Sequence, residues 1–213
     1  MSFASPTPGS AEILERRRAA LEHVQREHIV EGFAAAASEK GYAATTTADI
    51  ARLARVSKSS IYAHFADKEA IYLHLHAGVA DALLDALTAS VERTAGESDW
   101  RARIRDLVRA RLEVMASNPV FLAQVRIEPQ VATAAAATAR RNAGRHSAAL
   151  HIGLSREIAA STREVAELTP ELATAGLTGN LALIAQAAER GPAAVRSLED
   201  TLTDFWIRLF RAD

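Results

Sequence analysis

Helix-forming residues dominate this chain, and this feature constrains its fold more than any other. Alanine, leucine, arginine and glutamate recur throughout, whereas alternating runs of β-branched residues, which are typical of strands, do not occur. Proline fits the first turn of a helix, so Xaa-Pro pairs indicate where helices begin. The expected breaks after residue 76 are 96–99, Asn118-Pro119, Glu128-Pro129, Thr169-Pro170 and Gly191-Pro192. The pattern predicts an all-α fold with five helices beyond that residue.

Composition narrows the class of protein. The chain has 213 residues, 49% of them hydrophobic, which is enough for a sizeable core. It contains no cysteine, which excludes disulfides and thiolate metal sites, and no stretch approaches the ~20 apolar residues of a membrane span. We therefore expect a soluble cytoplasmic protein. Because the formal net charge is only −1, any contact with nucleic acid must be local.

The N-terminal third contains the parts of a helix-turn-helix. A first helix is predicted over about residues 20–40, and a short second helix follows the threonines at 45–47. A third helix, over about 58–65, follows a tight turn at 55–57. The expected domains are a frayed arm over 1–19, a helix-turn-helix over 20–76 and a larger helical domain over 77–213. The arginines at 16–18 favour a solvated helix face over a DNA-contacting arm, because glutamates surround them.

Polar side chains at these helix starts are suited to DNA. Hydroxyl groups and unpaired amides at helix N-termini bind phosphate oxygens, lysine neutralises phosphates, and tyrosine and histidine add donors. The candidate DNA-binding residues are Thr46, Thr47, Ser57, Lys58, Ser59, Ser60, Tyr62, His64 and Lys68. Two alternatives remain at this point. The threonines could act only as a helix cap, and Tyr62 could be a core residue.

Residues 41–69 read GYAATTTADIARLARVSKSSIYAHFADKE, which resembles the N-terminal signature of the TetR family of transcriptional regulators. The resemblance covers about residues 20–76 by motif, and the rest only by length and helical character. It implies a homodimer whose recognition helices enter adjacent major grooves of operator DNA, with an effector pocket in the larger domain. Arg55 and Ser59 stand where glycine is usual in the family, which predicts a strained or altered turn at Arg55.

The effector pocket implied by the resemblance would lie among the helices of about residues 100–168. Its candidate walls are Trp100, Ile104, Val108, Leu112, Met115, Phe121, Val125 and His151. The alternative is that these residues form plain core, since apolar residues at helical spacing usually do. The ligand itself cannot be identified from the sequence.

No constellation of residues indicates catalysis or metal binding. His146 and His151 are five apart and His74 and His76 two apart, so neither pair has the spacing of helical metal ligands. There is no set of nucleophile, base and orienting residue, and no glycine-rich phosphate loop. We therefore expect no enzymatic activity, no metal and no cofactor. A helical sensor whose effector is another protein is the second function class that fits the sequence.

The last part of the chain carries a seam suited to helix pairing. Apolar residues recur there at intervals of three and four, and the preceding helix offers a second stripe, so two helices from each of two chains could form a four-helix bundle. The candidate interface residues are Leu181, Ile184, Val195, Leu198, Leu202, Phe205, Trp206 and Leu209. The alternative is that this seam packs only within its own subunit. The predicted function is a repressor that binds a palindromic operator as a dimer and is released by a small molecule.

Overall fold

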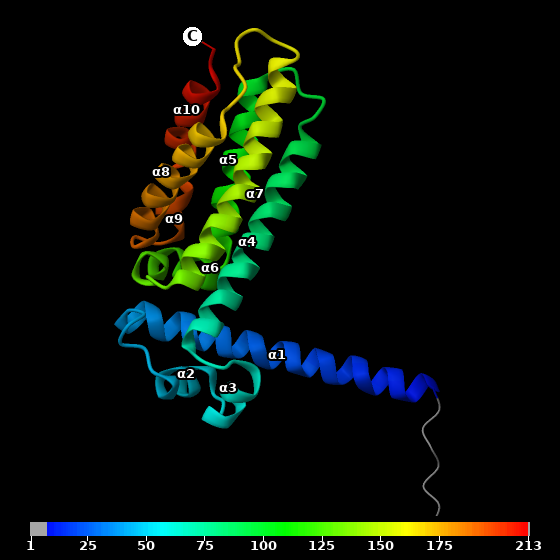
Figure 1. Cartoon of the computed structure of the whole chain (residues 1–213), viewed down its shortest axis with the longest axis vertical. Coiled ribbons are helices and arrows are strands. Elements are labelled where there is room, and N and C mark those ends of the chain that lie inside the picture. Colours follow the sequence, from blue (N-terminus) through cyan, green and yellow to red (C-terminus); the bar gives the residue numbers. More distant parts are fainter. Residues whose placement is uncertain (1–7, 213) are drawn as a thin grey trace, which may run out of the picture.

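The computed structural model describes the backbone of residues 8–212 and the side chains of residues 12–212, and every regular element of that part is a helix. The predicted all-α fold, with a small N-terminal domain and a larger C-terminal one, is confirmed (Figure 1). The elements are α1 (Pro8–Lys40), α2 (Thr47–Ala54), α3 (Lys58–His64), α4 (Lys68–Arg93), α5 (Trp100–Ser117), α6 (Pro119–Ile127), the 3₁₀ helix η1 (Glu128–Gln130), α7 (Ala134–Ala159), α8 (Pro170–Ala188), α9 (Pro192–Arg196) and α10 (Glu199–Phe210).

The N-terminal domain packs α2 and α3 against α1. Ile29 and Phe33 of α1, Ile50 of α2 and Ile61 of α3 are fully buried and form its core. Helix α1 begins at Pro8, well before the predicted start near residue 20. The expected frayed arm over 1–19 is therefore helical from residue 8 onward, and residues 1–7 lie outside the described residues.

The first half of α1 projects away from the rest of the molecule (Figure 1). Arg16 pairs with Glu12 at 2.7 Å and Arg18 with Glu22 at 3.0 Å, each one helical turn apart. Such exposed pairs stabilise an isolated helix by only a few tenths of a kcal/mol, roughly 0.3–0.5. The pairing agrees with a solvated helix face and does not single out a DNA-contacting arm.

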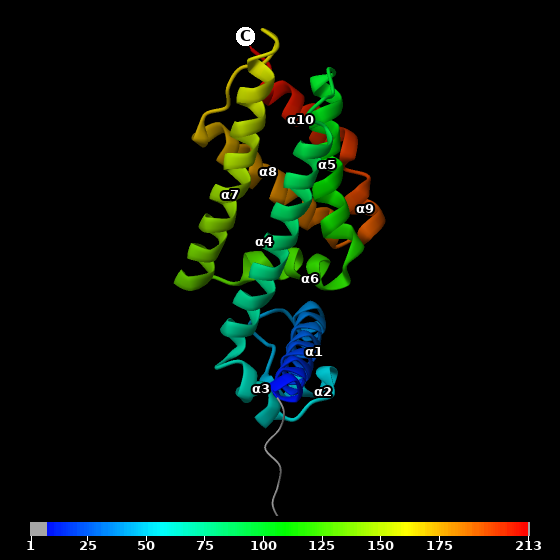
Figure 2. The ribbon, with the colours of Figure 1, turned by 90° about the vertical axis from the view of Figure 1, so that its right-hand side faces the viewer.

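The C-terminal domain is built around α4, α5 and α7, and α8 to α10 pack onto it (Figures 1 and 2). Helix α4 starts in the N-terminal domain and continues between α5 and α7, so one rigid element joins the two domains. It is the one described helix long and apolar enough to cross a membrane by composition. Because Ile71, Leu75, Val79 and Leu87 of α4 are buried in the core, that composition is explained by packing.

The last predicted helix is in fact two helices. Between α9 and α10 the amide of Leu198 donates to the carbonyl of Val195 at 3.2 Å, which is a tighter turn than an α-helix allows. The break redirects α10 so that Leu202, Trp206 and Phe210 are buried in the subunit. The sequence shows no proline or glycine at this point, and the prediction of five helices after residue 76 is therefore wrong.

Two glycines allow helices to approach closely, one in each domain. A β-carbon on Gly32 of α1 would lie 2.7 Å from both the β-carbon and the backbone nitrogen of Ala54. A β-carbon on Gly176 of α8 would lie 2.9 Å from the Trp206 ring and 3.0 Å from Leu209 Cδ2. The first contact includes backbone atoms, whereas the second is with side chains alone.

Candidate functional site

The helix-turn-helix is fixed by side-chain caps at both of its short helices. The Thr46 hydroxyl accepts from the Asp49 amide at 3.2 Å, while Asp49 Oδ2 accepts from the Thr46 amide at 3.0 Å and its hydroxyl at 2.7 Å. Ser57 accepts from the Ser60 amide at 3.0 Å at the start of α3. Because the Thr46 hydroxyl is fully used, it acts as a helix cap, and the prediction that it donates to phosphate is not supported.

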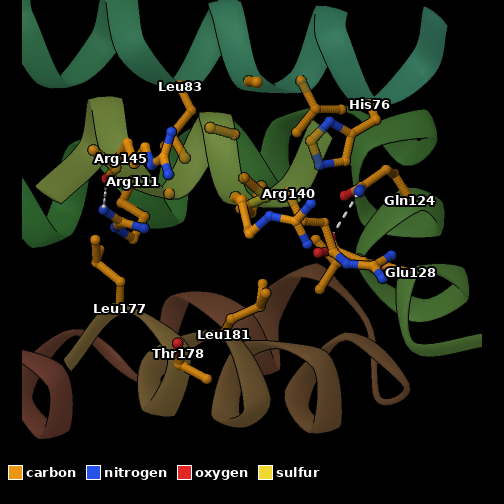
Figure 3. A pocket seen from close by; sticks show the side chains of 18 of the residues that line it. His76, Leu83, Arg111, Gln124, Glu128, Arg140, Arg145, Leu177, Thr178 and Leu181 are labelled. Carbon is orange, nitrogen blue, oxygen red and sulfur yellow. Dashed lines mark hydrogen bonds between the residues drawn. The ribbon is translucent and has the colours of Figure 1, made fainter. Parts of the chain in front are cut away.

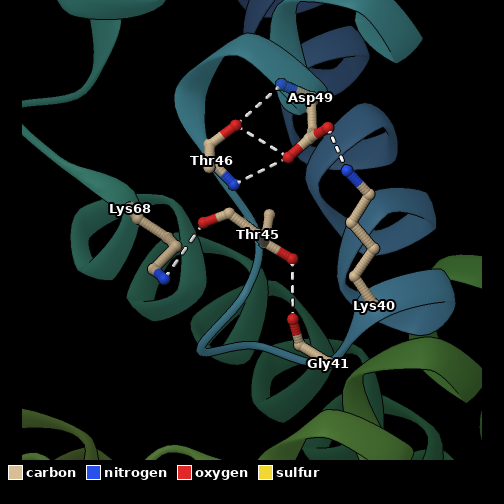
Figure 4. A network of polar contacts seen from close by, with 6 residues as sticks. All are labelled: Lys40, Gly41, Thr45, Thr46, Asp49 and Lys68. Atoms are coloured by element: carbon tan, nitrogen blue, oxygen red, sulfur yellow. Dashed lines mark hydrogen bonds and ion pairs between the residues drawn. The ribbon is translucent and has the colours of Figure 1, made fainter.

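Asp49 also ties α2 to the end of α1. Its second oxygen accepts from the ammonium of Lys40, as Figure 4 shows. The Lys40 ammonium, followed by the Thr46 hydrogen bonds, holds the pKa of this carboxyl well below its usual range. The Thr45 hydroxyl donates to the Gly41 carbonyl at 2.8 Å, so the loop before α2 is held at both ends.

Lys68, predicted to neutralise a phosphate, has a different partner. Its ammonium donates to the carbonyls of Tyr42 at 2.7 Å, Thr45 at 3.1 Å and Ala43 at 3.3 Å, and it lies 4.4 Å from the centre of the Tyr42 ring. An ammonium has three donors, so this set saturates it. The prediction for Lys68 is corrected: the side chain holds the loop between α1 and α2 (Figure 4).

The remaining candidates gather on the outward face of α3. Lys58, Ser59 and Tyr62 are exposed, and Tyr62 is 58% exposed, which excludes the core alternative for this residue. Its hydroxyl lies 3.4 Å from the Thr47 hydroxyl of α2. His64 is half-buried, and its Nε2 donates to Gln25 Oε1 of α1 at 2.9 Å. The structure thus brings together Thr47, Ser57, Lys58, Ser59, Ser60 and Tyr62, and their roles in binding stay predictions.

Arg55 ends α2 with φ 57° and ψ 37°, in the left-handed region. It is the one non-glycine residue with a positive φ in the described chain. Its amide donates to the Ala51 carbonyl, which closes the helix. The strained turn expected from Arg55 is present.

A pocket of about 560 Å³ opens in the C-terminal domain between α4, α7 and α8 (Figure 3). Its walls are His76, Val79, Ala80, Leu83, Arg111, Met115, Gln124, Val125, Glu128, Arg140, Arg141, Ala143, Gly144, Arg145, Ser147, Thr174, Leu177, Thr178 and Leu181. A cavity of this size falls within the ~300–1,000 Å³ of sites that bury a small molecule.

Only Met115 and Val125 of the predicted wall residues line this pocket. Trp100, Ile104, Val108 and Leu112 are buried core, and Phe121 packs against that core, as the alternative interpretation held. His151 lies behind the wall: its Nδ1 donates to the Ser147 carbonyl at 2.7 Å and its ring packs 4.4 Å from Trp206. Burial, followed by the charge of Arg111, lowers the pKa of His151 to about 3, so the ring is neutral at pH 7.

The predicted interface residues also divide. Ile184, Val195, Leu202 and Trp206 are buried inside the subunit, so they cannot form the seam between chains. Leu181 lines the pocket, while Leu198 and Leu209 are half-buried and Phe205 is 39% exposed. Apolar residues do recur at intervals of three and four, but most of them pack α8, α9 and α10 against the core of their own domain.

Comparison with known families decides the class of the N-terminal domain. Residues 29–75 match the family model described as bacterial regulatory proteins, tetR family. The N-terminal domain of the chain therefore matches the DNA-binding domain of the TetR family. The matched segment contains the helix-turn-helix, which supports a role in DNA-binding regulation. No curated protein sequence matches the chain significantly.

Solved structures support the same fold over most of the chain. A regulatory protein of the tetR family from Rhodococcus RHA1 superposes with a TM-score of 0.69 at 19% identity, covering 89% of this chain and 98% of its own. The fatty acid degradation regulator FadR from Bacillus halodurans gives 0.70 at 16%, with 86% and 94% covered. FadR from Bacillus subtilis, solved in complex with stearoyl-CoA, gives 0.65 at 14%, with 87% and 99% covered. At these identities the likeness shows the fold alone.

The arginines of the pocket were not among the residues predicted from the sequence. His76, the last residue of the predicted helix-turn-helix domain, lines the pocket from α4. Arg111 lies within the apolar stripe formed by Leu107, Val108 and Leu112 on α5. A charged residue inside such a stripe is the signal that could have identified it, since arginine is almost never buried without a reason.

Proposed function

We propose that this chain is a TetR-family repressor that binds a palindromic operator as a homodimer and is released by a small-molecule effector. The observation that carries the proposal is that α4 belongs to both functional regions. Its first residue, Lys68, holds the loop before α2, and His76, two turns later, lines the pocket. A ligand that shifts α4 would therefore also shift α2 and α3. The proposed location is the cytoplasm, because a regulator of this kind must reach chromosomal DNA.

The DNA contact is proposed for the outward face of α3 and the start of α2. Lys58 would act through charge, Tyr62 through its hydroxyl and ring, and Ser59 and Ser60 through close approach to base edges. Lys58→Ala should weaken binding about equally for all sequences and reduce the salt slope by roughly one unit, whereas Tyr62→Ala should cost about 1–3 kcal/mol at the operator. Wild-type affinity in both variants, measured in titrated gel shifts, would refute this placement.

A dimer is needed because one seven-residue recognition helix reaches few bases. Two such helices held about 34–36 Å apart would read both halves of a palindrome. Selection from random duplexes should therefore enrich a twofold-symmetric site with half-sites one helical turn apart. Enrichment of a single unrepeated half-site would count against the dimer.

The proposed dimer face is the outward side of α8 and α10. Leu172 and Leu183 of α8 and Phe205 of α10 are more than a third exposed, and Gly179 has open space where a β-carbon would stand. Leu198 and Leu209 adjoin them at partial exposure. Leu183→Arg should give a folded monomer with weak operator binding, because the charge would be buried only in the dimer. Glu189→Arg, on an exposed polar residue about 120° around the helix from Leu183, is the control in light scattering.

Effector release is proposed to act through two connections to the pocket. The first is α4. The second is η1, where Glu128 lines the pocket and Gln130 Oε1 accepts from the Tyr42 amide at 2.9 Å, across the domain boundary. The stearoyl-CoA complex of the Bacillus subtilis regulator is a precedent for a small-molecule ligand on this fold.

An effector can act only if it binds the DNA-competent and incompetent states with unequal affinity. It should bind more weakly when operator DNA is present, which calorimetry can measure. Gln130→Ala should reduce this difference while leaving binding to the pocket itself unchanged. A ligand with the same affinity in both conditions is not the inducer.

A further inference from the structure

Arg111 is the most unusual charged residue in the C-terminal domain. Its side chain faces the pocket from α5, yet the residue is only 8% exposed. Its one hydrogen bond runs from Nη2 to Ser147 Oγ at 2.8 Å, and no carboxylate of the described residues lies within ion-pair distance. Burial alone lowers its pKa to about 10, so it is still a cation at pH 7.

A second buried arginine on the same helix shows the contrast. Arg103 is 5% exposed and pairs with Glu157 at 2.9 Å. Proteins pair buried charges because the lost hydration must be replaced. Arg103 follows this rule, whereas Arg111 has a neutral hydroxyl as its only partner.

The rest of the pocket adds positive charge and an apolar wall. Arg140, Arg141 and Arg145 line it beside Arg111, against one carboxylate, Glu128, whose Oε2 accepts from Gln124 Nε2 at 2.8 Å. In Figure 3 Arg111 and Arg145 lie at one end, and His76, Gln124 and Glu128 at the other. Leu83 and Leu181 lie between the two ends.

We propose that the pocket binds an amphipathic anion, with its oxyanion headgroup against Arg111 and Ser147 and its apolar body along Leu83, Met115 and Leu177. This inference rests on the proposed effector role of the pocket. A guanidinium presents parallel donors that match a carboxylate or a phosphate, and Ser147 Oγ, which accepts from Arg111, keeps its own hydrogen for the headgroup. The ligand would supply the negative charge that the subunit does not.

The test compares four probes that share one alkyl chain: octanoate, octyl phosphate, octanol and octylamine. Calorimetry on the full-length protein should show the two anions binding at least ~10-fold more tightly than octanol, since a hydrogen bond to a charged partner is worth that much. Octylamine should bind more weakly than octanol. The ratio of octanoate to octyl phosphate then distinguishes a carboxylate from a phosphate headgroup.

Three variants locate the headgroup. Arg111→Met should abolish the preference for octanoate over octanol without lowering Tm, because it removes an uncompensated buried charge. Arg111→Lys should keep part of the preference, because lysine keeps the charge but not the parallel donors. Arg109→Met, on an exposed arginine of the same helix that pairs with Glu199, should leave the preference intact.

Equal affinity for octanoate and octanol in the wild type would overturn the inference. So would an anion preference that survives in Arg111→Met, or a large fall of Tm in that variant, which would indicate a structural role. Gel shifts with operator separate this result from the proposed function. Anions that bind without releasing DNA would leave the ligand class standing and remove the effector role.

Discussion

The lysines that hold the N-terminal domain together and the arginine that faces the C-terminal pocket differ in their partners. In the N-terminal domain Lys68 has three carbonyl partners and Lys40 pairs with Asp49, so both side chains hold a loop in one conformation. In the C-terminal domain Arg111 is more deeply buried, yet its partner is a single hydroxyl. A domain that reads DNA benefits from a fixed shape, because its contacts must be placed in advance. The effector proposed for the C-terminal domain would supply the partner that Arg111 lacks within the subunit.

The largest expected effect tests whether the C-terminal seam belongs to the subunit core. Leu202 is fully buried in the subunit, so Leu202→Arg should cost about 3–5 kcal/mol and unfold the C-terminal domain. The N-terminal domain, which shares no contact with Leu202, should lose less helical structure. Thermal unfolding followed by circular dichroism measures both.

Leu183→Arg is the matched control, since Leu183 is 41% exposed. It should remain folded with nearly unchanged Tm in the monomer. If Leu202→Arg instead gave a folded monomer, the residue would lie between subunits and the assignment to the core would be refuted.

The next prediction compares helix contacts in the two domains. Gly32→Ala should destabilise the protein by about 2–3 kcal/mol, because the new methyl group would meet the backbone of Ala54, which cannot rotate away. Gly176→Ala should cost only about 1 kcal/mol, because the Trp206 ring and Leu209 can shift. Chemical denaturation measures both values. Equal costs would show that the two interfaces are equally rigid.

A third prediction concerns pH and applies to the C-terminal domain. His151 has an ordinary pKa of 6.5 when unfolded and about 3 when folded, so the unfolded chain takes up the proton first. The neutral, buried ring therefore contributes fully to the free energy of unfolding above pH 6.5. This contribution falls as the pH is lowered toward 3, and about 2 kcal/mol of it is lost at pH 5. His151→Gln should flatten the dependence of the free energy of unfolding between pH 6.5 and 5. An unchanged slope in the variant would mean that His151 is not buried as a neutral ring.

The sequence predicted the N-terminal domain much better than the site in the C-terminal one. Signals in the first region are local: threonine and serine caps, a glycine after α1 and short apolar spacings decide each element from its own neighbours. Lys68 is an exception, because its partners lie 23 to 26 residues earlier, at a distance in sequence that local chemistry does not reveal.

The pocket could not be predicted because it is defined by pairs of residues far apart in the chain. Arg111 and Ser147 are 36 residues apart, and whether an apolar residue on α5 faces core or cavity depends on where α7 and α8 pack. The same limit explains the interface prediction. A spacing of three and four identifies a buried face, but it does not say whether the partner is another helix of the same chain or of a second one.

The smallest effect is expected at the turn that departs from the family pattern. A left-handed conformation costs a non-glycine residue about 1–2 kcal/mol, while glycine loses about 0.5–1 kcal/mol more backbone entropy on folding. Arg55→Gly should therefore stabilise the N-terminal domain by roughly 0.5–1 kcal/mol, and Arg55→Ala, which keeps the strain, should not. Arg55 is exposed between α2 and α3. A second role for its guanidinium would be a contact with a phosphate of bound DNA. In that case both variants would lower the salt slope of operator binding by about one unit, and only the glycine variant would gain Tm. A glycine variant less stable than the alanine variant would show that the turn is not strained.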